Sequence, residues 1–243
     1  MKHGTSLKSL SALAAVVAPA VLIALVPVSA SASVQPRVNV PTSPNYAGWL
    51  VPVGNKQSSK LSASTTFKVP NVTCTTTDDF VVPGVGIPTS SSIIASGVAV
   101  GCQGGVPFFT AETDINGVVT QLPVVVHPGD KIITTLSATG GATTGTFQDV
   151  TQDFKQSIKG DGGKGTGSCV GIDGDEEGGG GDPPVPDFGK VVFSSSTING
   201  KPISAATAVR LNMATSGGVV QIKTGALTKS GKGFTGTFAN TGS

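Results

Sequence analysis

A strict two-residue alternation in residues 61–69 is the feature that most constrains the fold of this chain. Every second side chain from Leu61 to Val69 is apolar or is the threonine Thr65, and the side chains between them belong to serine, threonine or lysine. A period of two places the apolar side chains on one face of an extended chain. The segment is therefore predicted to be a half-buried β-strand.

Similar segments recur along the chain, and turn signals separate them. The further predicted strands are residues 80–85, 93–100, 117–126, 131–137, 190–193, 208–213, 219–224 and 233–238. The turn signals contain glycine, as in Asn116-Gly117, Pro128-Gly129-Asp130 and Asn199-Gly200. Many short strands with glycine-rich turns and almost no helix predict an all-β sandwich or barrel.

The N-terminus has the pattern of a secretory signal peptide. A basic start precedes an apolar run at residues 10–28, and Ala30-Ser31-Ala32 has the small-x-small form at which such peptides are cleaved. A membrane anchor is the alternative, but the run contains two prolines and is at the short limit for spanning a bilayer. We expect a signal peptide at residues 1–32, an extended arm at 33–44 and one β-domain at 45–243. Within that domain, residues 160–186 are predicted to be a long glycine-rich loop with an acidic centre.

The expected mature chain is close to neutral. The whole chain has 16 basic and 14 acidic side chains, and the two lysines of the leader account for the difference. It shows no clustered positive charge of the kind that binds nucleic acid, and no later segment is apolar enough to span a membrane. We expect a secreted, extracellular monomer that binds no nucleic acid, no cofactor and, once the leader is removed, no membrane.

The three cysteines, Cys74, Cys102 and Cys169, all fall in the expected mature chain. An oxidising compartment favours one disulfide, and Cys74 and Cys102 each follow a predicted strand, so we expect those two to pair. Cys169 is then a free thiol, either buried and inert or the site of an intermolecular bond. As a nucleophile it would need a base, and the one histidine beyond the leader, His127, precedes a turn.

Six short motifs occur in order along the expected mature chain. They are Asn45-Tyr46-Ala47-Gly48, Thr66-Phe67-Lys68-Val69-Pro70, Val85-Gly86-Ile87, Ser96-Gly97-Val98, Pro128-Gly129-Asp130-Lys131-Ile132 and Asp187-Phe188-Gly189-Lys190-Val191-Val192-Phe193. Together they resemble the motifs of the glutamic peptidase (eqolisin) family. The resemblance implies an antiparallel β-sandwich of two large sheets, which agrees with the strands predicted above.

The family's peptidase chemistry needs two side chains, a glutamate that activates a water and a glutamine that orients that water and stabilises the oxyanion. Matched on the motifs, the glutamine position holds Ala95 and the glutamate position falls on Ser168. The alanine side chain can neither donate nor accept a hydrogen bond, and the serine side chain cannot replace a carboxylate as a general base. The resemblance therefore implies a protein without catalysis. The weak substitutes are Glu176 and Glu177 in the predicted acidic loop, and Gln103.

The family's cleft is rich in tryptophan and tyrosine, whereas this chain has one of each. Tyr46, Trp49 and Glu112 are the candidates for a binding groove, and for the two aromatic residues core packing is the alternative. The acidic residues of the predicted loop are expected to be solvated rather than to hold calcium, since their spacing matches no EF-hand. We expect a secreted binding or surface module for an extended peptide or a polysaccharide. The alternative is an acid endopeptidase that uses a displaced carboxylate.

Overall fold

The computed structural model describes residues 40–53, 57–58, 60–74, 78–90, 93–174 and 184–239. Contacts divide the chain into Met1–Val38 and Asn39–Ser243, and all described residues belong to the second unit. The predicted signal peptide and most of the predicted arm lie outside the described residues. Within them, no helix is long and apolar enough to cross a membrane.

The described chain is almost entirely β-strand, with one short 3-10 helix at Ile203–Ala205. The strands are β1 (Thr42–Ser43), β2 (Tyr46–Pro52), β3 (Lys60–Lys68), β4 (Asp79–Pro88), β5 (Ile93–Gln103), β6 (Val106–Ile115), β7 (Val118–Val125), β8 (Lys131–Thr139), β9 (Ala142–Asp149), β10 (Phe154–Asp161), β11 (Gly167–Gly174), β12 (Lys190–Ile198), β13 (Lys201–Pro202), β14 (Val209–Ala214), β15 (Val220–Thr224) and β16 (Phe234–Phe238). The all-β prediction is confirmed.

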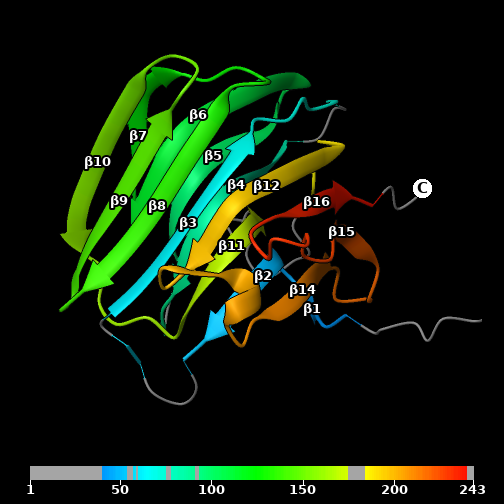
Figure 1. Cartoon of the computed structure of the whole chain (residues 1–243). Helices are drawn as coiled ribbons and strands as arrows, with labels where there is room; N and C mark the ends of the chain where they lie inside the picture. Colours follow the sequence, from blue (N-terminus) through cyan, green and yellow to red (C-terminus); the bar gives the residue numbers. More distant parts are fainter. Residues whose placement is uncertain are drawn as a thin grey trace, which may run out of the picture. The chain divides into compact units, whose positions relative to one another are not determined.

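The strands form one continuous hydrogen-bonded path, in the order β10-β9-β8-β3-β12-β16-β15-β14-β2-β11-β4-β5-β6-β7. Neighbours on this path are antiparallel, while β1 pairs with β14 in parallel and β13 pairs with β12. The path folds back on itself, nearly closed like a barrel, so that β8 to β10 lie in front of β4 to β7 (Figure 1). The separation into two large sheets stays a prediction, because β12 hydrogen-bonds to both β3 and β16.

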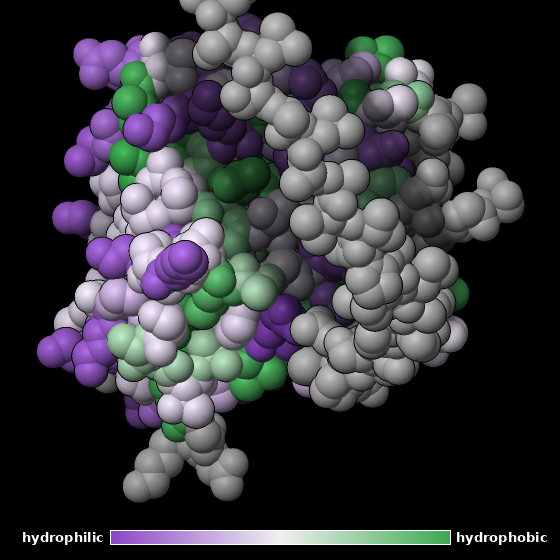
Figure 2. All heavy atoms as spheres, turned by 45° about the vertical axis from the view of Figure 1, so that its right-hand side comes forward, coloured by the Kyte–Doolittle hydropathy of each residue, from purple (hydrophilic) through white to green (hydrophobic). Residues whose placement is uncertain are grey.

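The predicted strand at residues 61–69 is confirmed as β3, with its alternation intact. Leu61, Ala63, Thr65 and Phe67 are at most 3% exposed, and the alternate side chains between them are half-buried. Phe67 packs against Phe193 of β12, which stacks on Phe234 of β16 with ring centroids 4.7 Å apart. The hydrophobic core is therefore continuous from β3 through β12 to β16. On the face turned forward in Figure 2, hydrophobic residues gather in a recessed band between more hydrophilic ones.

Polar groups also join the two layers of the folded path. Thr134 of β8 donates a hydrogen bond to the hydroxyl of Ser96 on β5 at 2.9 Å, and Ser96 bonds Thr113 of β6 at 3.1 Å. All three side chains are at most 1% exposed. Buried hydroxyls without partners would destabilise the core, so this cluster fixes which residues of the two layers face each other.

The other eight strands predicted from the sequence are also present, with shifted ends. The predicted ranges do not include β2, β6, β9 or β10, although β10 alternates half-buried and exposed side chains along its whole length. One prediction is wrong: the segment at residues 160–186 is not a continuous loop, because Gly167–Gly174 forms β11. This strand is hydrogen-bonded to β2 on one side and to β4 on the other, and most of its residues are buried.

The expected disulfide between Cys74 and Cys102 is confirmed. It joins the connection after β3 to the end of β5 across a sequence separation of 28 residues. Closing a loop of that length stabilises the folded state by about 3–4 kcal/mol in the chain-entropy account. Cys169 is a free, buried cysteine.

A polar cluster stabilises the end of the domain where β8 begins and β9 ends. Asp130 and Asp149 are 6% and 0% exposed, and the side-chain amide of Gln152 donates to one carboxylate oxygen of each, at 2.9 and 3.1 Å. The second oxygen of Asp149 accepts the backbone N–H groups of Thr151 and Gln152. Gln152 therefore separates two carboxylates that would otherwise repel each other.

Replacing Gln152 with alanine is expected to lower the free energy of unfolding by about 1–3 kcal/mol, because two buried carboxylates lose a shared donor. Gln103→Ala is the matched control, since Gln103 is an exposed glutamine beside a turn. Urea unfolding of both variants measures the difference. Equal stability of the two variants would show that the amide does not stabilise the cluster.

Candidate functional site

A row of four glycines crosses four adjacent strands at the centre of the β2–β5 region. Gly97 of β5 pairs with Gly84 of β4, Gly84 with Gly171 of β11, and Gly171 with Gly48 of β2. Directly paired residues on antiparallel strands present their side chains to the same face. One face of the sheet therefore has a strip of bare backbone, which we call the glycine floor.

Tyr46 explains two of these glycines. A Cβ atom at Gly171 would lie 2.6 Å from the Tyr46 hydroxyl oxygen, and a Cβ at Gly48 would collide with the same atom. The tyrosine side chain therefore lies over the backbone of both residues, and its hydroxyl donates to the carbonyl oxygen of Trp49 at 3.4 Å. At all four glycines a Cβ would also collide with a backbone oxygen of a neighbouring strand. These positions need glycine because other atoms occupy the space of a side chain.

The next row on the same face contains Ala95, Gly86 and Cys169. Ala95 of β5 pairs with Gly86 of β4, and Gly86 pairs with Cys169 of β11. The Ile93 side chain and the Cys169 sulfur cover Gly86, since a Cβ placed there would lie 2.6 Å from Ile93 Cδ1 and 2.8 Å from the sulfur. Ala95 and Cys169 therefore flank one glycine and face the same space.

Ser168, the residue matched to the glutamate from sequence, does not share that face. It precedes Cys169 on β11 and so points to the opposite side of the strand. It is 0% exposed, and its hydroxyl is buried without a hydrogen-bond partner among the described residues. The structure thus separates Ala95 from Ser168 and brings Ala95 and Cys169 together.

A cavity of about 340 Å³ opens beside Cys169. Tyr46, Cys169 and Asp173 line it with apolar residues of the surrounding strands, Leu50, Ile93 and Leu211. Tyr46 pairs with Asp173 in the β2–β11 register, and its side chain extends from there over the glycine floor toward the thiol. Sequence reasoning missed this arrangement, because it depends on β11 being a strand.

Burial keeps the Cys169 thiol and the Tyr46 phenol at the cavity neutral. It raises the pKa of the Cys169 thiol to about 12, and the negative charge of Asp173 adds to the effect, while hydrogen bonds from Tyr46 and Gly86 partly oppose it. Burial also raises the pKa of Tyr46 well above its ordinary value, helped by Cys169 and Asp173. A thiol nucleophile needs its thiolate form, so Cys169 is poorly suited to covalent catalysis.

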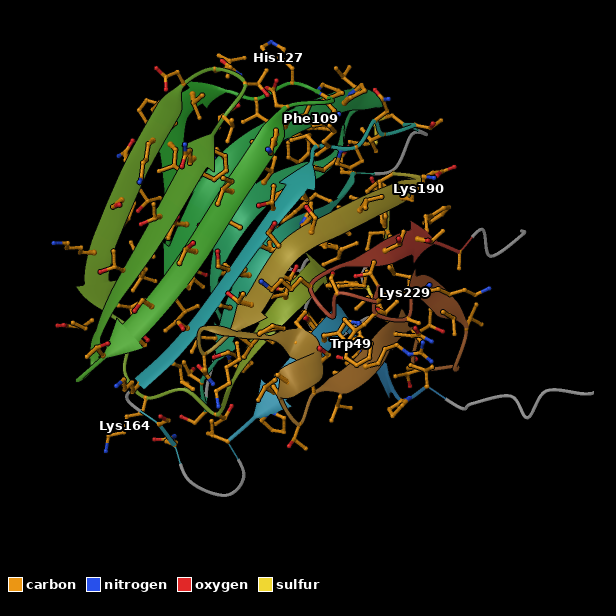
Figure 3. The ribbon with its side chains drawn as sticks, viewed as in Figure 1. Trp49, Phe109, His127, Lys164, Lys190 and Lys229 are labelled. Carbon is orange, nitrogen blue, oxygen red and sulfur yellow. A yellow bond between two sulfur atoms is a disulfide. The ribbon has the colours of Figure 1, made fainter. Side chains whose placement is uncertain are left out.

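The one histidine among the described residues does not serve Cys169 as a base. His127 lies after β7, with a side chain 64% exposed and its Nδ1 atom 3.6 Å from an Asp130 carboxylate oxygen. Figure 3 shows His127 at one end of the strands, away from Trp49 of β2. The thiol and the imidazole therefore do not form a nucleophile–base pair.

The three groove candidates fall on two different faces. Tyr46 lies on the glycine floor, and Glu112 of β6 ends the glycine row by pairing with Gly97. Trp49 pairs with Val170 on the opposite face, where it packs against the core with a buried indole N–H that has no partner among the described residues. The core-packing alternative therefore describes Trp49 but not Tyr46.

The candidate Gln103 does not reach this space. Gln103 ends β5, eight residues after Ala95, which is about 27 Å along an extended strand. Asp114 of β6 pairs with Ala95 and so extends the same row. Burial raises the pKa of its carboxyl, and one carboxylate oxygen accepts the N–H of Gly117 at 2.9 Å, which holds the following turn. Glu176 and Glu177 lie outside the described residues. No group of three or more metal-ligating side chains occurs in the described ranges.

No protein-family model matches the chain, and no curated protein matches it in sequence. Its structure is similar to that of scytalido-glutamic peptidase with a transition-state analogue inhibitor, with a TM-score of 0.64 and 16% identity over 80% of this chain and 98% of that chain. It is also similar to SCP-B, a member of the eqolisin family of peptidases in a complex with the tripeptide Ala-Ile-His, with a TM-score of 0.62 and 17% identity over the same shares. These likenesses show a glutamic-peptidase-like fold, as the motifs led us to expect.

The raised pKa of Cys169 makes the stability of the domain sensitive to alkaline pH. Because the pKa is higher in the folded state than in the unfolded chain, where a thiol titrates near about 8.5, the contribution is complete below that pH and is lost as pH rises toward 12. Urea unfolding at about pH 7 and about pH 10.5 is expected to show a smaller alkaline loss for Cys169→Ala than for the parent chain. Equal losses would contradict a neutral, buried thiol.

Because Ser168 and Cys169 lie on opposite faces of β11, we expect glutamate to destabilise the domain more at position 168 than at position 169. Ser168→Glu buries a charge in the core and is expected to lower the free energy of unfolding by about 3 kcal/mol or more. Cys169→Glu places the carboxylate beside the cavity and is expected to be less damaging by about 2 kcal/mol, despite the nearby Asp173. Ser168→Ala is the control, with a change within about 1 kcal/mol, since its hydroxyl has no partner. Equal damage by the two glutamates, measured by urea unfolding, would contradict the assigned faces.

Proposed function

We propose that the chain is a secreted binding protein on a glutamic-peptidase-like fold and that it does not cleave peptides. The observation that carries the proposal is the row of Ala95, Gly86 and Cys169 beside the glycine floor. A peptidase of this kind needs a carboxylate and an amide on one water. At the two sites that flank Gly86, this row offers a methyl group and a neutral thiol.

We take Cys169, rather than Ser168, as the counterpart of the family's glutamate. Two side chains that act on one water must project from the same face of the sheet, and Cys169 shares its face with Ala95. A thiol whose pKa is raised to about 12 cannot serve as a general base under acid conditions. The proposal holds for either residue, because neither Ser168 nor Cys169 supplies the carboxylate that the reaction needs.

The proposed ligand is an extended peptide or a polysaccharide lying on the glycine floor. Tyr46 lies over Gly48 and Gly171 and presents an aromatic surface there, while Gly84 and Gly97 carry no side chain that would hold a chain-like ligand away from the sheet. The cavity beside Cys169 could hold one side chain or sugar substituent of the ligand. A tripeptide is the ligand in the SCP-B complex, which supports a peptide for a related fold without fixing one here.

Secretion is part of the proposal and rests on two features. The first residues have the pattern of a signal peptide, and the Cys74–Cys102 disulfide suits an oxidising compartment. N-terminal sequencing of protein recovered from culture medium is expected to begin after Ala30 or Ala32. Full-length protein retained in the cell would contradict secretion.

The function is tested by incubating the mature protein with an unfolded polypeptide, reduced carboxymethylated lactalbumin, between about pH 2 and pH 5, where a carboxylate base can work. We expect no cleavage above background, and binding of the polypeptide or of a soluble β-glucan that Tyr46→Ala weakens at least about tenfold. Val125→Ala on the exposed edge strand β7 is the control and is expected to bind normally.

Two results would overturn the proposal. Cleavage that is lost in Glu176→Gln or Glu177→Gln would establish the alternative, an acid endopeptidase with a displaced carboxylate. Absence of binding to both polymers, or equal loss in the Tyr46 and Val125 variants, would remove the glycine floor as a binding surface. A preference for one polymer identifies the ligand class.

A further inference from the structure

A second and larger hollow lies away from the glycine floor. It has a volume of about 660 Å³ and is formed by the end of β3, the start of β8, the start of β12 and the Asp187-Phe188-Gly189 turn. None of its lining residues lines the cavity beside Cys169. We call it the lysine groove, and Lys190 at its edge is labelled in Figure 3.

The floor of the lysine groove is apolar. Val192 of β12 is 54% exposed and faces into it, and Pro70 adds a second apolar surface. Phe67 and Phe188 lie beneath, each at most 2% exposed, so the floor rests on packed core. An exposed valine on a rigid base is a surface that an apolar ligand group can cover without rearrangement.

Three lysines surround this floor. Lys68 and Lys131 are directly paired across β3 and β8, and Lys190 begins β12 on the other side of β3. Like charges placed directly opposite each other destabilise a sheet. Among the described residues, no ion pair involves any of the three. A bound anion would relieve the repulsion between Lys68 and Lys131.

One carboxylate lies in the same lining. Asp187 is exposed, and its Oδ1 atom accepts the backbone N–H of Gly189 at 3.0 Å, which holds the turn. The lining therefore carries three ammonium groups against one carboxylate. The net charge of the groove is positive, while its floor is apolar.

We propose that the lysine groove binds a small amphipathic anion, an organic molecule with an apolar body and a carboxylate, sulfonate or phosphate group. The body covers Val192 and Pro70, and the charged group lies between Lys68 and Lys131, where each ammonium can donate a charge-assisted hydrogen bond. The volume is within the range of small-molecule sites, and three clustered charges suit one compact anion better than a long polyanion.

The probe for this proposal is 8-anilinonaphthalene-1-sulfonate, and its control is N-phenyl-1-naphthylamine, which has the same apolar body without the charge. Fluorescence titration of the mature protein is expected to give at least about tenfold tighter binding for the sulfonate, with the difference shrinking as salt is added. Equal affinity for the two probes at low salt would overturn the proposal.

Three variants assign the binding to this groove. Lys68→Gln is expected to weaken sulfonate binding at least about fivefold and to leave the neutral probe unchanged, because only the charge is removed. Asp187→Asn is expected to tighten sulfonate binding, because it removes the opposing charge while keeping an oxygen for the Gly189 N–H. Lys155→Gln, at an exposed lysine of β10, is the matched control and is expected to change nothing.

The variants also provide the contrary outcomes. Equal effects of Lys68→Gln and Lys155→Gln would show that the probe senses overall charge rather than this groove. Weaker sulfonate binding in Asp187→Asn would show that the carboxylate is not at the anion's edge. Urea unfolding of each variant checks that affinities are compared between equally folded proteins.

Discussion

The packing of Tyr46 over the bare backbone of Gly48 and Gly171 is the contact on which the candidate face depends. It requires β2 and β11 to be neighbours in one register, since only then do the two glycines lie side by side under the ring. The same contact brings the phenol to the thiol of Cys169 and to the edge of the cavity. A side chain larger than hydrogen at either glycine would displace the ring and change all of these positions at once.

The strands that alternate polar and apolar residues were predictable from the sequence, and β11 was not. Its sequence contains three glycines and a cysteine, which local propensity assigns to a loop. What makes it a strand is tertiary: β2 and β4 supply hydrogen bonds on both sides, and Tyr46 fills the space above Gly171. In hindsight, the apolar Val170 and Ile172 two residues apart are the local sign of a buried strand.

The proposed counterpart of the family's glutamate, Cys169, differs by one residue from the sequence match, and one residue changes the face. Ala95 lies on β5, which pairs with β4, while Ser168 is a buried residue on the opposite face from Ala95. Because side chains alternate along a strand, a shift of one moves a residue from the cavity to the interior. Counting residues between motifs does not fix the face of a residue when the length of the intervening segment differs from the family's. The hydrogen-bond register of β11 with β4 does fix it.

A floor made of glycine has a consequence for selectivity. Backbone atoms are the same whatever the residue, so the glycine floor offers the proposed ligand no side chain that could distinguish its substituents. Changes within the floor cannot adjust what is bound, since any added side chain collides with its surroundings. Selectivity for the proposed ligand must then come from Tyr46, Asp173 and Glu112 at the borders of the glycine floor. Variants with new ligand preferences would differ at these three positions and keep the four glycines.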